Sequence, residues 1–149
     1  LADFKSVNDI HSLYNYHAKH KYLFMSYNQT LMRKLGKIAA NDDRNKNEFV
    51  INEYYENLLL MFAKKPRFQS NINTHMHIMG YFKKILSSKE KKHFLEVLDQ
   101  YRSKMLPLSS VNMLLFSWVV RFKNDYLSNQ SFFNPFPLDL IEKQNSRFL

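Results

Sequence analysis

The chain has 149 residues, a length that suits one domain with one hydrophobic core. It contains no cysteine, which excludes disulfides, thiolate zinc sites and cysteine-ligated iron–sulfur clusters and fits a cytoplasmic protein. The formal net charge of +9 is compatible with ordinary solubilising charge. It also favours a polyanionic partner, with nucleic acid first and an anionic membrane surface second.

Apolar residues recur three and four positions apart along most of the chain, which is the spacing of one helix face. We therefore predict an all-α fold, in which residues 1–149 form a single-domain bundle of about six helices with an irregular aromatic C-terminal tail. Ser6 and Ser87 are the predicted N-caps of the first and fifth helices. Residues 131–137 are expected to pack across the bundle, ahead of a last short helix over residues 138–143. The main helices are expected over residues 7–27, 29–40, 46–63, 72–86, 88–104 and 111–127.

No segment of the chain is expected to cross a membrane. The most apolar run, residues 106–120, contains Pro107 and several Ser and Asn residues. It falls short of the roughly 20 apolar residues that a spanning helix needs. The N-terminal region is polar and charged, so the sequence indicates no signal peptide.

The first predicted helix carries His17, His20 and Lys21 within stripes that are otherwise apolar. Polar groups at such positions cost free energy unless they find partners. The two histidines are hydrogen-bonded core residues, or they ligate a metal with His77, or they bind an anion with Lys21. Because Lys21 opposes a cation and no carboxylate lies near in sequence, we predict no metal site.

An anion site at this cluster requires helices 7–27 and 72–86 to pack with their polar positions together. That packing would bring Asn73, His77 and Lys84 to the cluster. Imidazole, amide and ammonium groups all donate hydrogen bonds to phosphate oxygens.

Basic residues also surround both ends of helix 72–86. They form either a solvated face or a patch that contacts RNA phosphates. Tyr81 and Phe68 lie near this patch in the sequence, and unpaired bases stack on such aromatic rings. Arg102 is either a surface residue or a buried ion-pair partner of a carboxylate such as Glu53. The basic residues are Lys64, Lys65, Arg67, Lys83, Lys84, Lys89, Lys91 and Lys92.

Short motifs that span nearly the whole chain make it similar to a known family. They are Tyr16-His17-Ala18-Lys19-His20-Lys21, Leu35-Gly36, Asn73 through His77, Gly80-Tyr81-Phe82-Lys83, Glu90-Lys91, Tyr101-Arg102, Pro107-Leu108, Tyr126-Leu127, Gln130 and Pro135-Phe136-Pro137. No one motif is decisive, but in this order and spacing they resemble the YbgA-type domain of unknown function. The sequence departs from the family pattern at Asn71, where histidine is usual, and at Lys104, where glycine is usual.

The resemblance implies a partner. In that family the domain is often fused behind an iron–sulfur desulfidase domain of the thiouracil type, where it serves as the tRNA-binding part of a tRNA 4-thiouridine desulfidase. This sequence includes neither the desulfidase domain nor any cysteine ligand for its cluster. The resemblance and the charge together predict a tRNA- or RNA-binding module that acts alone or beside a separate desulfidase-type enzyme.

We predict no catalytic residues and no cofactor, because the sequence lacks cysteine, a Gly-x-Ser-x-Gly motif and a glycine-rich phosphate loop. Two alternatives stay open. One is a small enzyme or anionic-ligand-binding protein that uses the His/Lys cluster. The other is a protein-interaction domain with an exposed aromatic patch over Phe132–Phe136. The predicted anion- or RNA-binding residues are His17, His20, Lys21, Asn73, His77, Tyr81, Lys83, Lys84 and Arg102.

Overall fold

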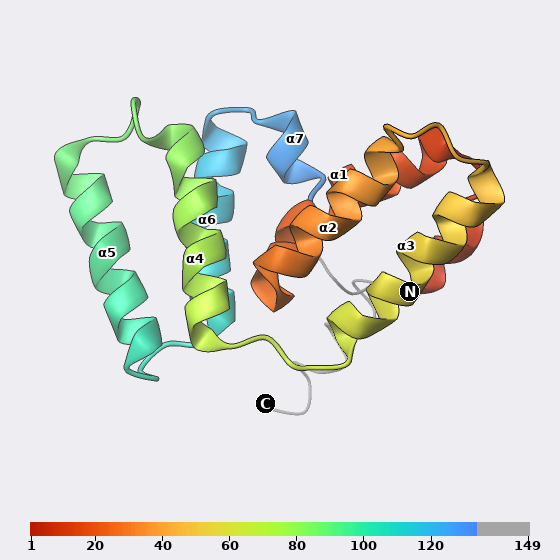
Figure 1. The fold of residues 1–149 in the computed structure, drawn as a ribbon. Helices are drawn as coiled ribbons and strands as arrows, with labels where there is room; N and C mark the ends of the chain where they lie inside the picture. Colours follow the sequence, from red (N-terminus) through yellow and green to blue (C-terminus); the bar gives the residue numbers. More distant parts are fainter. Residues whose placement is uncertain (134–149) are drawn as a thin grey trace.

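The chain folds into helices over residues 1–133, the part that the computed structural model describes (Figure 1). No strand occurs in that part, so the predicted all-α, single-domain fold is confirmed. The described residues form seven α-helices, of which α7 has only 4 residues, and two short 3-10 helices. In chain order these are η1 (Ala2–Ser6), α1 (Ile10–Tyr27), α2 (Gln29–Ala40), α3 (Asn47–Phe62), α4 (Phe68–Met79), η2 (Gly80–Phe82), α5 (Ser88–Arg102), α6 (Leu108–Arg121) and α7 (Asp125–Ser128).

Helix α1 joins two groups of helices. It packs against α2, α3 and α4, whereas α6 packs against α4, α5 and α7. In Figure 1, α1 to α3 form one group, and α4 to α6 stand next to one another in the second. Leu13 and Phe24 of α1 are fully buried, but Tyr14 is exposed. Helix α1 is therefore enclosed on most sides and open along one stripe.

Reciprocal capping boxes set two of the helix starts. At α1 the Asp9 carboxylate accepts a hydrogen bond from the Ser12 backbone N–H at 2.7 Å, and Ser12 Oγ accepts one from the Asp9 N–H at 3.1 Å. The predicted cap at Ser6 is wrong, because these reciprocal bonds start the helix three residues later. At α5 the predicted capping box is present, with Ser87 Oγ accepting from the Glu90 N–H at 3.1 Å.

The predicted fourth and sixth helices are each divided in the structure. Helix α4 begins at Phe68 and tightens to 3-10 geometry at Gly80. Helix α6 follows Pro107 directly and ends at Arg121, because Lys123 has a left-handed φ of 54° that no α-helix contains. Neither α6 nor any other helix within residues 1–133 is long and apolar enough to cross a bilayer.

The predicted exposed aromatic patch over Phe132–Phe136 is wrong for its first residue. Phe132 is only 4% exposed, and its ring packs edge-on against that of His75 with the centroids 5.5 Å apart. Phe133 is partly buried against the core and packs on Phe116. The rest of the patch and the short helix predicted over residues 138–143 lie outside the described residues.

Lys104 lies in the left-handed region of backbone conformation, with a φ of 62° in the connection between α5 and α6. This region disfavours a side chain with a Cβ and suits glycine. A lysine at this position therefore places backbone strain in the chain.

Replacing Lys104 by glycine should raise the free energy of unfolding by about 1 kcal/mol relative to Lys104→Ala. Alanine is the matched control, because both variants lose the contact of the Lys104 ammonium with the Phe68 ring at 5.8 Å. Urea unfolding followed by circular dichroism measures the difference. Equal stability of the two variants would mean that the connection carries no strain.

Candidate anion-binding site

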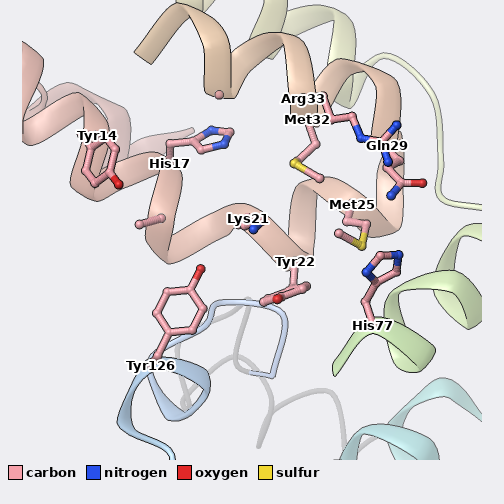
Figure 2. A pocket seen from close by; sticks show the side chains of 12 residues that line it. Tyr14, His17, Lys21, Tyr22, Met25, Gln29, Met32, Arg33, His77 and Tyr126 are labelled. Carbon is pink, nitrogen blue, oxygen red and sulfur yellow. The ribbon is translucent and has the colours of Figure 1, made fainter. Parts of the chain in front are cut away.

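A pocket of about 480 Å³ opens between α1 and α2 (Figure 2). In this view Tyr14 and His17 lie on one side of Lys21, and Gln29, Arg33 and His77 lie on the other. The lining comes from α1 (Tyr14, His17, Ala18, Lys21, Tyr22, Met25), α2 (Gln29, Met32, Arg33, Gly36), α4 (His77) and α7 (Tyr126). Four helices therefore meet at the pocket, which explains why no single stretch of sequence shows it.

His17 forms one wall of the pocket, and neighbours on three helices hold its ring. Nδ1 lies 2.9 Å from the hydroxyl of Tyr54 on α3, and the ring packs against Phe24 of α1. Toward α2 the ring reaches Gly36, where an added Cβ would lie only 3.1 Å from Nε2. Glycine at this position lets the imidazole approach the α2 backbone.

The neutral form of His17 offers an N–H group at the pocket. Burial, helped by the positive charge of Lys21, lowers the pKa of His17 to about 4. The fully buried Tyr54 hydroxyl has His17 Nδ1 as its hydrogen-bond partner among residues 1–133, so it donates its proton there. Nδ1 then accepts, and the ring proton is on Nε2, the atom beside Gly36.

Two cationic side chains line the pocket without an ionic partner. Neither Lys21 nor Arg33 forms an ion pair within residues 1–133, and no Asp or Glu is part of the lining. Lys21 Nζ lies 5.7 Å from the centre of the Tyr22 ring, so an aromatic face partly compensates its charge. The positive charge of Lys21 and Arg33 is therefore available to an external anion.

Two of the predicted residues support the lining from behind. Asn73 of α4 donates a hydrogen bond at 3.1 Å to Oε1 of Gln29, which lines the pocket. The Tyr81 hydroxyl lies 2.8 Å from that of Tyr22, and burial together with this bond raises the pKa of Tyr22. Asn73 and Tyr81 therefore position pocket residues rather than face the cavity.

Gln130 also reaches α1 at the pocket. Its side-chain N–H group donates to the Ala18 carbonyl at 2.6 Å, and its Oε1 accepts from the Tyr22 N–H at 3.3 Å. Those two backbone groups pair with each other in a regular α-helix. The segment after α7 thereby holds the wall that Ala18 and Tyr22 form.

The other predicted residues lie elsewhere. His20 faces away from the pocket, with Nδ1 at 2.6 Å from Ser131 Oγ, beside a separate depression lined by Asp3 and Lys19. Lys83 and Lys84 are exposed in the turn after η2. The structure thus unites His17, Lys21 and His77, but not His20, Lys83 or Lys84.

Arg102 is exposed at the end of α5 and is not part of the core. Its Nη1 pairs with Asp99 Oδ1 at 3.0 Å, so Glu53 is not its partner.

Within residues 1–133 no group of three or more His, Asp or Glu side chains is arranged to hold a metal ion.

Arg33, Tyr14 and Tyr126 are pocket residues that the predicted set does not contain. The helical pattern of residues 29–40 places Arg33 outward, which is correct, but the pocket lies at that outer face. The sequence feature that could have indicated the pocket is the pair Arg33 and Gly36. Arg33 has a long cationic side chain, and Gly36, the one glycine of α2, lies about one turn further along the helix.

His75 on α4 lies outside the pocket and is fully buried. Its Nε2 lies 2.9 Å from Asn112 Oδ1 of α6. Burial lowers the pKa of His75 to about 4, and burial likewise lowers that of His20 to about 4. Together with His17, three imidazoles are therefore kept neutral by the folded state.

These features define a small helical protein with a carboxylate-free, cationic pocket between α1 and α2. The family model described as "Protein of unknown function (DUF1722)" matches residues 21–137, and the chain belongs to that family. The chain is 26% identical over 127 residues to "Uncharacterized protein YbgA" of Escherichia coli (strain K12), covering 85% of this chain and 75% of the relative. No solved structure matches it significantly. The resemblance inferred from the motifs is therefore confirmed, and the names of the relatives state no activity.

Gly36→Ala should cost stability that Gly80→Ala does not. An alanine Cβ meets nothing within 4 Å at Gly80, whose backbone is helical, so that variant should gain up to about 1 kcal/mol. At Gly36 the Cβ crowds His17 Nε2, and we expect Gly36→Ala to be at least about 1 kcal/mol less stable than Gly80→Ala. Urea unfolding compares the two, and equal values would show that His17 moves aside freely.

Stability should fall as the pH drops from 7.5 to 5.5. In that window the histidines of the unfolded chain, with a pKa near 6.5, become protonated. In the folded protein His17, His20 and His75 stay neutral, because their pKa values are about 4. The unfolded state then binds more protons, which lowers the free energy of unfolding by about 1 kcal/mol for His75 and somewhat less for the two others. His75→Gln should reduce this pH-dependent loss by about 1 kcal/mol, whatever its own stability. Urea titrations at both pH values measure it, and an unchanged loss in the variant would contradict the assignment.

Proposed function

We propose that this protein is a non-catalytic RNA-binding module, with tRNA as its first candidate, and that the pocket between α1 and α2 receives a phosphate of the RNA. One observation carries the proposal. Lys21 and Arg33 line the same pocket, neither has an ionic partner within residues 1–133, and no carboxylate lines that pocket.

The pocket supplies the hydrogen-bond donors that a phosphate needs. Lys21 and Arg33 donate from charged groups, and Nε2–H of the neutral His17 adds a fixed donor. Charge-assisted hydrogen bonds to phosphate oxygens are stronger than neutral ones. A bound anion would also relieve the repulsion between the two cations.

Charge outside the pocket favours RNA over a small free anion. Lys83 and Lys84 follow Tyr81 by two and three residues, and the Tyr81 hydroxyl bonds the pocket residue Tyr22. The net charge of +9 adds an attraction to polyanions over the whole chain. The family resemblance, which implies a tRNA-binding role, makes tRNA the first RNA to test.

The lining favours binding over catalysis. A nucleophile with its base, or a pair of carboxylates, is the usual equipment of a hydrolytic or transfer site. His17 has Nδ1 engaged with Tyr54 and a pKa well below neutrality, so it is a poor general base at pH 7. The module would act alone or beside a separate desulfidase-type enzyme.

Filter binding to tRNA at two salt concentrations tests the proposal. We expect affinity to fall steeply from 50 to 200 mM salt, on the order of a hundredfold or more if several phosphates are contacted. Lys21→Met with Arg33→Met should weaken binding by about tenfold or more and make the salt slope shallower by about two.

The matched control is Lys5→Met with Lys34→Met, which removes the same charge from exposed positions outside the pocket. It should change affinity far less than the pocket variant. Binding that does not respond to salt, or equal effects of the two double variants, would contradict a role of the pocket in RNA binding.

A further inference from the structure

The pocket has a second chemical character besides its charge. Aromatic rings of Tyr14, Tyr22 and Tyr126 line it, and the thioether side chains of Met25 and Met32 add apolar surface. In Figure 2, Tyr14 and Tyr126 lie to the left of Lys21 and Tyr22 lies below it. Arg33 and His77 lie to the right of Lys21. A site for bare phosphate would not need this apolar surface.

We infer that the pocket takes a single nucleotide with a terminal phosphate, the phosphate at Lys21 and Arg33 and the base against the tyrosines. This rests on the proposed function and names the chemical unit of RNA that enters the pocket. The volume of about 480 Å³ lies in the range of small-molecule sites, roughly 300 to 1,000 Å³.

The aromatic residues suit a base. Tyr14 is 61% exposed and Tyr126 is 41% exposed, so part of each side chain is open to a ligand. Stacking on an aromatic ring binds any base, because every base has a π-face. The Tyr126 hydroxyl is protonated at neutral pH and can donate a hydrogen bond. Burial, with the neighbouring Tyr81 as a further cause, raises its pKa further.

The charge count favours a terminal phosphate over an internal one. A phosphomonoester carries a charge of about −1.5 to −2 at pH 7, whereas an internal diester carries a single negative charge. Lys21 and Arg33 supply two positive charges in a pocket without a carboxylate. Only the monoester balances both of them, while His17 adds a donor without adding charge.

Calorimetry and NMR titration with AMP, adenosine and inorganic phosphate test the pocket directly. AMP should bind at least about tenfold more tightly than adenosine or phosphate alone, since the cationic and the aromatic side chains each add contacts. Lys21→Met with Arg33→Met should weaken AMP binding by about tenfold or more. Arg33→Met alone, at an exposed position that cannot disturb the core, should weaken it in the same direction.

Tyrosine variants separate stacking from charge. Tyr14→Leu should weaken AMP binding several-fold, Tyr14→Phe should retain it, and Tyr55→Leu, at a half-exposed position on α3 outside the pocket, should leave it unchanged. AMP binding no tighter than phosphate binding, or AMP binding that is indifferent to both Arg33→Met and Tyr14→Leu, would overturn the inference.

Single-stranded oligonucleotides distinguish an RNA end from a free nucleotide. If an RNA end is the ligand, a 5′- or 3′-phosphorylated oligonucleotide should bind more tightly than its unphosphorylated form, and AMP should compete with it. AMP binding without any RNA binding would support the nucleotide pocket but overturn the RNA-binding function. Salt-sensitive tRNA binding that AMP does not displace and that ignores terminal phosphates would do the reverse.

Discussion

The contact between His17 and Tyr54 is the interaction on which the candidate site depends. It joins α1 to α3 through a 2.9 Å hydrogen bond, and the same ring touches α2 at Gly36. Because the buried hydroxyl has to donate, it selects the tautomer of the imidazole and so decides which nitrogen carries the proton. One hydrogen bond therefore links α1 to α3 beside α2 and sets the polarity of one pocket wall.

The neutrality of His17 matters as much as its position. A third full charge beside Lys21 and Arg33 would raise the repulsion in the pocket, and burial prevents it by lowering the pKa of His17 to about 4. The pocket thus keeps two cations on long side chains and one neutral donor on a ring held by its neighbours. This division suits an anion that must be both attracted and oriented, because long side chains supply charge and the fixed ring supplies direction.

The sequence predicts the helices well and the site only in part, for a physical reason. Helical periodicity and capping boxes are local, so α2 and the start of α5 follow directly from nearby residues. His17 and Lys21 are one turn apart and share a face, whereas His20 points to another side of α1 and bonds Ser131. The predicted cluster contains both faces of the helix, and only the packing shows which of them borders a cavity.

The contribution of residues far along the chain could not be predicted from α1 and α2. Gln130 bonds the Ala18 carbonyl and the Tyr22 N–H across more than a hundred residues of sequence, and Ser131 bonds His20 in the same way. These side chains fix the segment after α7 to the middle of α1, close to Tyr126, which closes one side of the pocket. A glutamine that bonds the backbone of a distant helix has no periodic signal, yet its amide matches one donor and one acceptor at once. The part of the pocket wall that Ala18 and Tyr22 form is therefore held by a long-range contact from Gln130, among the last described residues, as well as by the packing of the histidine-rich first helix.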